Sequence, residues 1–390
     1  MIHTLNGIKV LECTHAVMGP SAGLLLADAG AEVIHIEPIE GDSTRRLRGF
    51  GTGYFTFFNR NKKSLALNLK HPAGRDIFYA MTKTSDVVLE NFGPGTMDRL
   101  GLGYEPLADL NPRLIYASLK GFLPGPYEKR HAMDEVVQMM AGLAYMTGRP
   151  GDPLRAGSSI VDITGGMFGY IGILLALYER EHTGRGKYVQ ASLFETAAFL
   201  MGQHMACGAI SREPVPPMPA RVSAWSIYSV FDTSDGEKVF VGVISEKHWE
   251  KLCAAFDWAD WASDPRLATN NLRISERNWF LPELAMRFAQ FTKAEIMEKC
   301  DRNGIPFAPI AKPEDLFEDP QLTQGDNLLD QQLPDGRFAP LPNFPLDYGG
   351  QRASLYAQPP AAGEHTTEIL NSIGIAGAAL EDLKEKGIIA

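Results

Sequence analysis

The carboxylate of Asp162 stands in residues 158–166 (SSIVDITGG), between an apolar stretch and a run of glycines. A helix predicted from residue 164 to 180 places this carboxylate at a helix N-terminus, where the macrodipole favours the ionised form. An ionised, partly desolvated carboxylate can attack an activated acyl group, and backbone N–H groups near glycines can hold the resulting oxyanion. The same pattern is typical of a helix N-cap, so the local sequence leaves both roles open.

A basic, aromatic segment lies between residues 43 and 75. It contains eight Lys and Arg residues and no Asp or Glu, so the rest of the chain (29 basic, 47 acidic residues) carries a net charge of -18. Aromatic rings are interleaved with these cations at Phe50, Tyr54, Phe55, Phe57 and Phe58. Such rings can stack a base while the cations bind phosphates, which favours a nucleotide-like ligand or single-stranded nucleic acid. The charge run alone is also typical of a solvated surface.

The composition of the 390 residues argues against several other classes of protein. A net charge of -10 is untypical of a dedicated nucleic-acid binder. The four cysteines are widely spaced, and we find no metal-ligand spacing, P-loop or nucleophilic serine motif, so we expect no metal and no tightly bound cofactor. The longest apolar stretch, residues 167–178, is too short to span a bilayer, and no signal peptide is recognisable. We therefore expect a cytoplasmic protein without a membrane partner.

The first half of the chain reads as an open α/β domain that must position these groups. Strands are predicted at residues 8–12, 31–37, 64–69, 86–90 and 114–118, with helices at 21–29 and 71–83 between them. Strand–helix–strand order implies parallel pairing with right-handed crossovers. No GxGxxG follows the first strand, so a nicotinamide or flavin dinucleotide is not indicated. Residues 134–146 read as one helix, and residues 189–207 as a strand followed by a helix.

The second half of the chain predicts a smaller domain and a return to the first. Four prolines mark residues 211–221 as a linker after a large domain over 1–210. A hairpin at 226–231 and 239–243 and helices at 247–256, 279–290 and 293–302 predict an α+β domain over 222–320. Residues 321–362 form an extended return linker, and residues 363–390 contain helices at 364–372 and 376–385 that rejoin the large domain.

Several ordered blocks together resemble the class III CoA-transferases, the family of formyl-CoA transferase and crotonobetainyl-CoA:carnitine CoA-transferase. They are residues 7–37, 59–69 (NRNKKSLALNL), 90–95 (ENFGPG), 99–104, 111–121, Asp162 with its glycines, 180–186 (REHTGRG) and 363–366. The resemblance implies a Rossmann-like large domain built from both chain ends, a small α+β domain, and two subunits threaded through one another as an interlocked homodimer.

The resemblance also implies roles for individual residues. Asp162 matches the catalytic aspartate of the family. Segments that contact CoA are matched by His15, Ala16, Val17, Leu69, Lys70, Asn91, Phe92 and Arg99. The family forms a mixed anhydride on its aspartate, then an aspartyl-CoA thioester that the acceptor acid attacks. The basic segment is then expected near the CoA entrance, where cations would neutralise phosphates.

Departures from the family pattern narrow the expected substrate. Oxalate-handling members carry Gln where this sequence has Val17, and a glycine run that residues 214–225 lack, so oxalate is not expected. The related α-methylacyl-CoA racemases carry His immediately before the aspartate of the next upstream block. That block reads His131-Ala132-Met133-Asp134 here. Met133 at the racemase position argues against proton exchange, and His131 reads as an ordinary loop histidine.

The expected acyl group is inferred from residues 221–247 and 306–309, which resemble the branch of the family that acts on short dicarboxylates. We expect succinyl-CoA as donor and a small organic acid as acceptor, a C4–C5 dicarboxylate or a sulfinate analogue. Arg221, Arg45 and Arg46 are candidates to face a second carboxylate, although surface or CoA-phosphate roles fit them better. The alternatives are a racemase-like isomerase, which would exchange the C2 proton, and a noncatalytic nucleotide or nucleic-acid binder.

Overall fold

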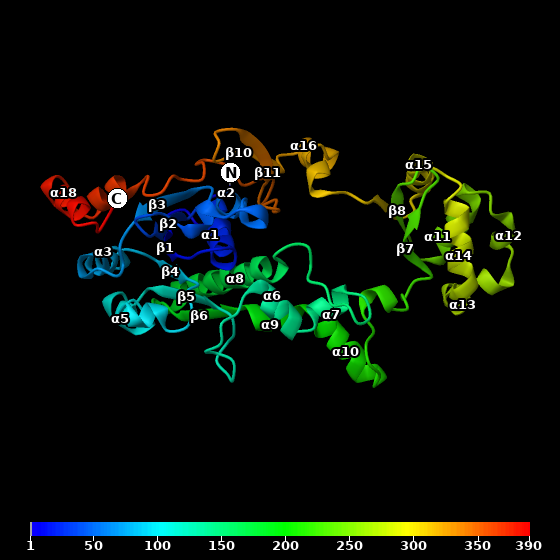
Figure 1. Ribbon diagram of the computed structural model, residues 1–390, viewed down its shortest axis with the longest axis horizontal. Coiled ribbons are helices and arrows are strands. Elements are labelled where there is room, and N and C mark those ends of the chain that lie inside the picture. Colours follow the sequence, from blue (N-terminus) through cyan, green and yellow to red (C-terminus); the bar gives the residue numbers. More distant parts are fainter. Residues whose placement is uncertain (1) are drawn as a thin grey trace. The chain divides into compact units, whose positions relative to one another are not determined.

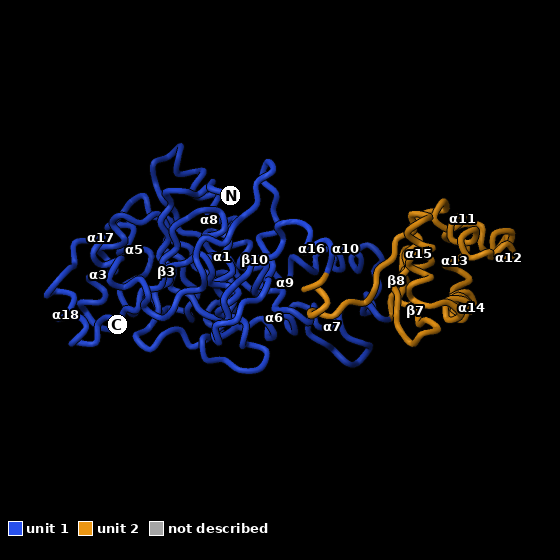
Figure 2. The backbone as a smooth tube through the Cα atoms, turned by 90° about the horizontal axis from the view of Figure 1, so that it is seen from above, with its two compact units in different colours: residues 1–219, 319–390 blue, residues 220–318 orange. Residues whose placement is uncertain are grey.

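The computed structural model describes residues 2–390, which divide into two compact units (Figure 2). Unit 1 comprises Met1–Pro219 and Asp319–Ala390, and unit 2 comprises Ala220–Glu318. Both ends of the chain therefore belong to unit 1, and unit 2 is an insertion between them.

A six-stranded parallel sheet forms the centre of unit 1 (Figure 1). Its strands pair in the order β3-β2-β1-β4-β5-β6, and every pairing is parallel. The strands are β1 (Lys9–Cys13), β2 (Glu32–Glu37), β3 (Lys62–Ala66), β4 (Val87–Glu90), β5 (Ile115–Lys120) and β6 (Tyr188–Ser192). The predicted α/β class with a central parallel sheet is confirmed.

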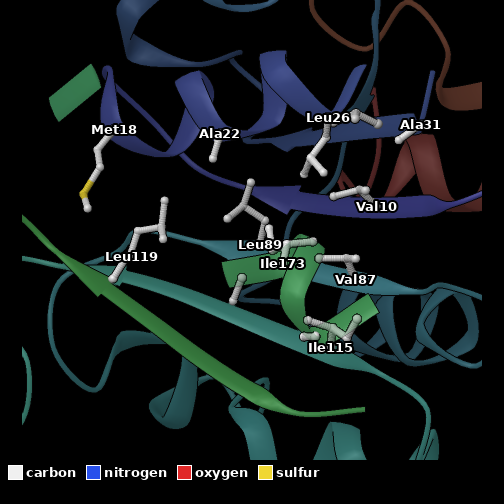
Figure 3. Close-up of a cluster of buried hydrophobic side chains, with 14 of the residues drawn as sticks. Val10, Met18, Ala22, Leu26, Ala31, Val87, Leu89, Ile115, Leu119 and Ile173 are labelled. Atoms are coloured by element: carbon white, nitrogen blue, oxygen red, sulfur yellow. The ribbon is translucent and has the colours of Figure 1, made fainter. Parts of the chain in front are cut away.

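Helices cover both faces of this sheet, and its central strands β1, β4 and β5 are buried along almost their whole length. One face packs against α1 (Met18–Asp28) and α8 (Ile160–Thr183), where Val10, Leu89 and Ile173 join one apolar core (Figure 3). The opposite core contains Leu11, Val88 and side chains of the other helices. Those helices are α3 (Pro72–Thr82), α5 (Tyr104–Leu110), α17 (Thr366–Ser372) and α18 (Ala378–Glu385).

Glycines bring α8 into backbone contact with α1. A Cβ atom added to Gly166 would lie 2.6 Å from the carbonyl oxygen of Met18, and one added to Gly165 would lie 2.8 Å from the Met18 methyl carbon. A Cβ at Gly169 would meet Leu119 of β5 at 2.7 Å. The glycine-rich stretch therefore serves close packing against neighbouring elements.

The helix α8 is long and apolar enough to cross a membrane by length and composition, and it is the one such helix in the described part of the chain. One such helix is weak evidence of a membrane span, because the core helix of a soluble protein is often as long and as apolar. Here α8 packs against α1, β5, β6 and α9 (Leu193–Leu200) as the central helix of unit 1. Its other side exposes Met167, Ile171, Leu175 and Tyr178.

Two predictions of local structure were wrong. Residues 134–146 form two helices, α6 (Asp134–Met140) and α7 (Leu143–Thr147), because Gly142 adopts a left-handed φ of 83° between them. Residues 321–362 contain an antiparallel hairpin of β10 (Leu328–Gln332) and β11 (Phe338–Pro342), closed at Gly336 with φ 84°. The prolines there masked the hairpin, since proline usually argues against a strand.

Shorter helices complete unit 1. They are α2 (Tyr54–Phe58), α4 (Thr96–Arg99), α10 (Gly202–Ser211) and α16 (Pro320–Thr323). The helix α2 follows the basic segment's first arginines, and α4 follows the loop after β4.

Unit 2 is an antiparallel sheet packed against helices. Its strands, in the order β7-β8-β9, are β7 (Ile227–Asp232), β8 (Lys238–Val243) and β9 (Phe307–Pro309). Trp249, Phe280 and Phe288 fill its core. The helices are α11 (Glu246–Ala255), α12 (Ala259–Ala262), α13 (Asn270–Ser275), α14 (Arg277–Phe288) and α15 (Lys293–Asn303).

Candidate active site

The strand order of unit 1 reverses between β1 and β4, and a crevice opens there at the carboxyl ends of the strands. The two loops that border it are locked together. His15 donates its backbone N–H to the Asn91 Oδ1 at 2.9 Å, and the Asn91 Nδ2 donates to the His15 carbonyl at 2.9 Å. The ring of His15 stacks on that of Phe92, with centroids 5.6 Å apart. The crevice therefore has a rigid rim.

A cavity of about 400 Å³ lies at this rim. It brings together six of the predicted site residues, which are Asp162, His15, Ala16, Val17, Asn91 and Phe92. Among the residues that the structure describes, Leu69, Lys70 and Arg99 do not line it. Arg99 lies close by at the end of α4, where its guanidinium donates to the carbonyl of Pro94, a cavity residue. The same cavity is lined by Tyr54, one of the aromatic residues of the basic segment, and by Lys120 and Arg155, which the sequence missed.

The start of α8 corrects the expected position of Asp162. The helix begins at Ile160, so Asp162 lies within its first turn rather than before it. The capping is done by Asp134, whose Oδ2 accepts the N–H groups of Val161 at 2.9 Å and Asp162 at 3.2 Å. Asp162 is thus not an N-cap. Its own carboxylate has no hydrogen-bond partner among residues 2–390.

Burial, together with the negative charge of Asp134, raises the pKa of Asp162 to about 7 against the opposing positive charge of Arg155. Desolvation disfavours the charged form of any carboxyl group. The helix macrodipole favours the ionised form at this position, but desolvation outweighs it here. Near neutral pH, Asp162 exchanges readily between carboxylate and carboxylic acid, which is the behaviour of groups placed for chemistry.

The backbone donors of the cavity lie on α1 rather than on the glycines of α8. The first amides of α8 are occupied by Asp134. In contrast, Ala16, Val17 and Met18 line the cavity where α1 begins, and the first N–H groups of a helix have no partner within it. Ala16 adopts a left-handed φ of 63°, which sharpens this turn.

The basic segment turns out to be largely an internal network of ion pairs. Arg60 is buried against Asp28 at 2.6 Å, Lys62 against Glu12 at 2.9 Å, and Arg45 pairs with Glu37 at 2.6 Å. The acidic partners lie outside residues 43–75, so the charge run could not reveal them. Buried, paired cations cannot neutralise the phosphates of a ligand. The exposed cations of the segment are Arg46, Arg48 and Lys70, while the half-buried Arg75 donates to the Lys70 carbonyl.

The aromatic residues of the segment divide between two roles. Phe55 and Phe58 are buried core residues. Tyr54 lines the cavity, and Phe50 is 68% exposed with the Arg155 guanidinium 5.8 Å from its ring centroid. Only part of the segment is therefore placed near the cavity.

His131 also lies at the cavity, although the sequence indicated an ordinary loop histidine. Met133, one residue before Asp134, lines the cavity as well. The sequence marked Asp134 as the aspartate of the upstream block but gave it no role, because its link to Asp162 spans 28 residues and no local pattern signals it. Within residues 2–390, no group of three His, Cys, Asp or Glu side chains is arranged to hold a metal ion.

The model of CoA-transferase family III matches residues 5–366. A formyl-CoA:oxalate CoA-transferase of Rhodopseudomonas palustris is 33% identical over 419 residues, covering 100% of this chain and 98% of its own length. The human succinyl-CoA:glutarate CoA-transferase is 30% identical, covering 95% of this chain and 86% of its own. A CAIB/BAIF family protein from Brucella suis superposes with a TM-score of 0.84 at 30% identity, covering 95% of this chain and 99% of its own.

Proposed function

Because the chain belongs to CoA-transferase family III, we propose that it moves CoA from succinyl-CoA to a small organic acid through a thioester on Asp162. One observation carries the proposal. The Asp162 carboxylate stands without a hydrogen-bond partner in a cavity that it shares with five of the eight residues predicted to contact CoA. A carboxylate so placed is free to act as a nucleophile.

The reaction proceeds by acyl exchange at Asp162. Its carboxylate attacks the donor thioester carbonyl, a C–O bond forms, the C–S bond breaks, and a mixed anhydride and CoA thiolate result. The thiolate attacks the aspartyl carbonyl of the anhydride, which gives aspartyl-CoA and the free donor acid. The acceptor carboxylate then attacks aspartyl-CoA, and the same steps run in reverse. Each step exchanges one acyl bond for another, so no net proton or hydride is transferred.

The residues around Asp162 would serve each tetrahedral step. The amides at the start of α1 lie at the cavity and would stabilise the oxyanion. His15, Ala16, Val17, Asn91 and Phe92 would hold the thioester end of CoA. Leu69, Lys70 and Arg99, which lie outside the cavity, would contact more distant parts of the same ligand.

The acid that accepts CoA is proposed from sequence departures and relatives together. The two relatives act, by their names, on formyl-CoA with oxalate and on succinyl-CoA with glutarate. Val17 lines the cavity where oxalate-handling members carry Gln, so we favour a short dicarboxylate or a sulfinate analogue. Arg45 is already paired with Glu37 and does not suit a second carboxylate. The guanidinium of Arg46 donates to the carbonyl of Glu40.

A homodimer of interlocked subunits accounts for an exposed apolar surface on α8, α9 and α10. Tyr178 is 71% exposed, Phe199 72% and Ile210 83%, and Met167 and Leu175 are exposed beside them in sequence on α8. Contiguous exposed apolar surface marks an interaction site, and two-fold homodimers are the commonest oligomers. Native mass spectrometry of the purified protein tests this. A monomer at all concentrations would refute the dimer.

A racemase-like isomerase is the second candidate, because His131 lies at the same cavity as Asp162. Two bases near C2 of an acyl-CoA are what proton exchange requires. Incubation with 2-methylacyl-CoA in deuterium oxide tests it. Incorporation of deuterium at C2 without any second acid would favour the isomerase. The third alternative, a nucleic-acid binder, loses its main support because the basic segment is mostly paired internally.

The decisive test of the transferase is the adduct on Asp162. The wild-type chain is incubated with succinyl-CoA, trapped with hydroxylamine or borohydride, and digested for mass spectrometry. We expect a mass change on the peptide that contains Asp162, and none in Asp162→Ala. A screen of small acids with succinyl-, acetyl- and formyl-CoA, read by chromatography of the CoA products, then identifies both substrates. No adduct with any donor would refute the proposal.

The cellular location that we propose is the cytoplasm. The long apolar helix α8 contributes to the central core of unit 1, and the four cysteines are unpaired, three of them buried. Unpaired cysteines are typical of reducing compartments. Fractionation of the native host with an antibody against the chain would test this.

A further inference from the structure

Arg155 is the cation placed among the carboxylates at one end of the active cavity. Asp134, Glu135 and Asp162 line that cavity together with it. One carboxylate connects the two functional groups, because Asp134 holds the backbone N–H of Asp162 with Oδ2 at 3.2 Å and approaches the Arg155 Nη2 with Oδ1 at 3.5 Å. Arg155 and the proposed nucleophile Asp162 therefore face the same cavity. Its charge also opposes the raised pKa of Asp162.

The guanidinium is fixed on one side and open on the other. Its Nε donates to the Ala156 carbonyl at 3.0 Å, and its Nη2 donates to the Ser158 carbonyl at 3.0 Å. Both acceptors lie just before α8, so they hold Arg155 at the helix entrance. Its Nη1 has no protein partner in the described chain. Its ion pairs with Asp134 at 3.5 Å, through Nη2, and with Glu135 at 3.8 Å, through Nε, are both long and single, unlike the bidentate pairs of which arginine is capable.

The other cations of the cavity are differently engaged. Lys120 is paired with Glu90 at 2.7 Å and donates to the Phe92 carbonyl at 2.7 Å. Arg130 lies over the ring of Tyr127, 4.9 Å from its centroid. Lys120 is therefore held at the loop after β4, and Arg130 is held by an aromatic ring of its own segment. Arg155 alone among these three contacts Asp134, which caps the helix of the nucleophile.

We propose that Arg155 binds the reacting carboxylate of the acid substrate. This rests on the proposed transferase function. In each half of that reaction, an acid must lie beside Asp162 as an anion, in a cavity that already holds two other carboxylates. Bringing a third negative charge there is unfavourable without a cation. An arginine with one open edge of its planar fork matches a carboxylate in charge and geometry.

The bond changes leave Arg155 intact throughout. The acceptor carboxylate, bound at the guanidinium, attacks the aspartyl-CoA carbonyl, a C–O bond forms and CoA leaves as thiolate. The thiolate then attacks the acceptor side of the anhydride, a C–S bond forms, and Asp162 is released as carboxylate. Arg155 holds negative charge in both the ground state and the departing acid, so its loss is expected to weaken acid binding more than acyl-CoA binding.

Kinetics with three variants test the assignment. Arg155→Gln removes the charge, Arg155→Lys keeps it without the planar fork, and Arg149→Gln is the control, since Arg149 is an exposed arginine on the preceding turn. For Arg155→Gln we expect the KM of the acid to rise about tenfold or more, with the KM of succinyl-CoA within twofold. The KM of the acid in Arg155→Lys should fall between those of wild type and Arg155→Gln. Guanidinium chloride added at low concentration should partly restore a low KM in Arg155→Gln. The control should match wild type.

Three readouts separate this role from others. In Arg155→Gln, we expect the KM of the acid to rise equally for monocarboxylic and dicarboxylic acceptors. A rise in KM confined to dicarboxylic acceptors would overturn the assignment of Arg155 to the reacting carboxylate. A parallel rise in both KM values with a lowered melting temperature would show a structural role and overturn it. The adduct on Asp162 is measured first in the wild type. Its absence there would refute the transferase function itself, while its presence with an unchanged acid KM in Arg155→Gln would refute only the role of Arg155.

Discussion

Two aspartates of unit 1, the buried Asp42 and the half-buried Asp162, show opposite uses of the same side chain. Burial alone would raise the pKa of Asp42, yet contact with His35 and hydrogen bonds from Thr44 lower it to about 2. Burial raises the pKa of Asp162 to about 7, and no hydrogen bond to its carboxylate within residues 2–390 offsets it. Withdrawal from water is common to both. What distinguishes the proposed nucleophile is that the fold leaves it without a partner.

The surroundings of each aspartate extend the contrast. Near Asp42, Arg45 lies 2.6 Å from the carboxylate of Glu37 and Lys62 lies 2.9 Å from that of Glu12. Thr14 also donates a hydrogen bond to Glu12. Near Asp162, the nearest carboxylate is used as a helix cap and its charge adds to the pKa shift. The charges near Asp42 stabilise the fold only as long as every member is present. The charges near Asp162 set the reactivity of that one carboxyl group, at some loss of folding stability.

The largest expected effect comes from removing the unpartnered charge. Asp162→Asn keeps the shape but cannot form the thioester, so turnover should fall about 10⁴-fold, as for other nucleophiles. A raised carboxyl pKa means that the folded state loses stability as pH rises from about 4 toward 7. The melting temperature of Asp162→Asn should therefore exceed that of wild type by more at pH 8 than at pH 5. Calorimetry at both pH values measures this, and an equal difference would contradict it.

Breaking the partnered group should chiefly affect stability. Lys62→Met leaves Glu12 buried without its cation, and we expect a loss of about 3–5 kcal/mol in the free energy of unfolding. Lys63→Met is the matched control, because Lys63 pairs with Glu32 and Glu368 at the surface and should cost at most about 1 kcal/mol. Urea denaturation measures both. Similar losses in the two variants would show that burial does not separate these ion pairs.

The pH dependence of the first half-reaction should report Asp162 directly. Only the carboxylate attacks the thioester, so the rate of adduct formation should rise about tenfold per pH unit below the pKa and level off above about 7. Rapid quenching with succinyl-CoA at pH 5–9 measures it. A rate that is flat from pH 5 to 7 would mean that Asp162 is as fully ionised as Asp42.

The smallest effect on the reaction is expected from a change at Asp134, which caps the N-terminus of α8. Asp134→Asn keeps an oxygen for the amides of Val161 and Asp162 but removes the charge that adds to the raised pKa. The acid limb of the same pH profile should move toward lower pH by less than about one unit. Circular dichroism serves as the control for helix content. A shift toward higher pH would show that Asp134 holds Asp162 by geometry alone.

The sequence predicted the sheet and most helices because parallel strands such as β1 and β4 contain short runs of apolar residues (Val10–Leu11 and Val87–Leu89) with clear turns between them. It also placed Asp162, through motif resemblance. It could not place Asp134 or Arg155, because their relation to Asp162 exists only once α6 and the entry to α8 fold together. The basic segment misled for the same reason. Arg60 and Lys62 look like ligand cations until Asp28 and Glu12 are found beside them.

The contact between Gly166 and the backbone of Met18 has a consequence for how this molecule can diverge. Main-chain atoms, rather than exchangeable side chains, set the spacing between α8, which carries Asp162, and α1, which follows the His15–Val17 loop. Side chains at the cavity such as Val17, Tyr54 and Met133 can change without altering that spacing. Engineering a new acid preference should therefore leave the two helices untouched and vary only this lining.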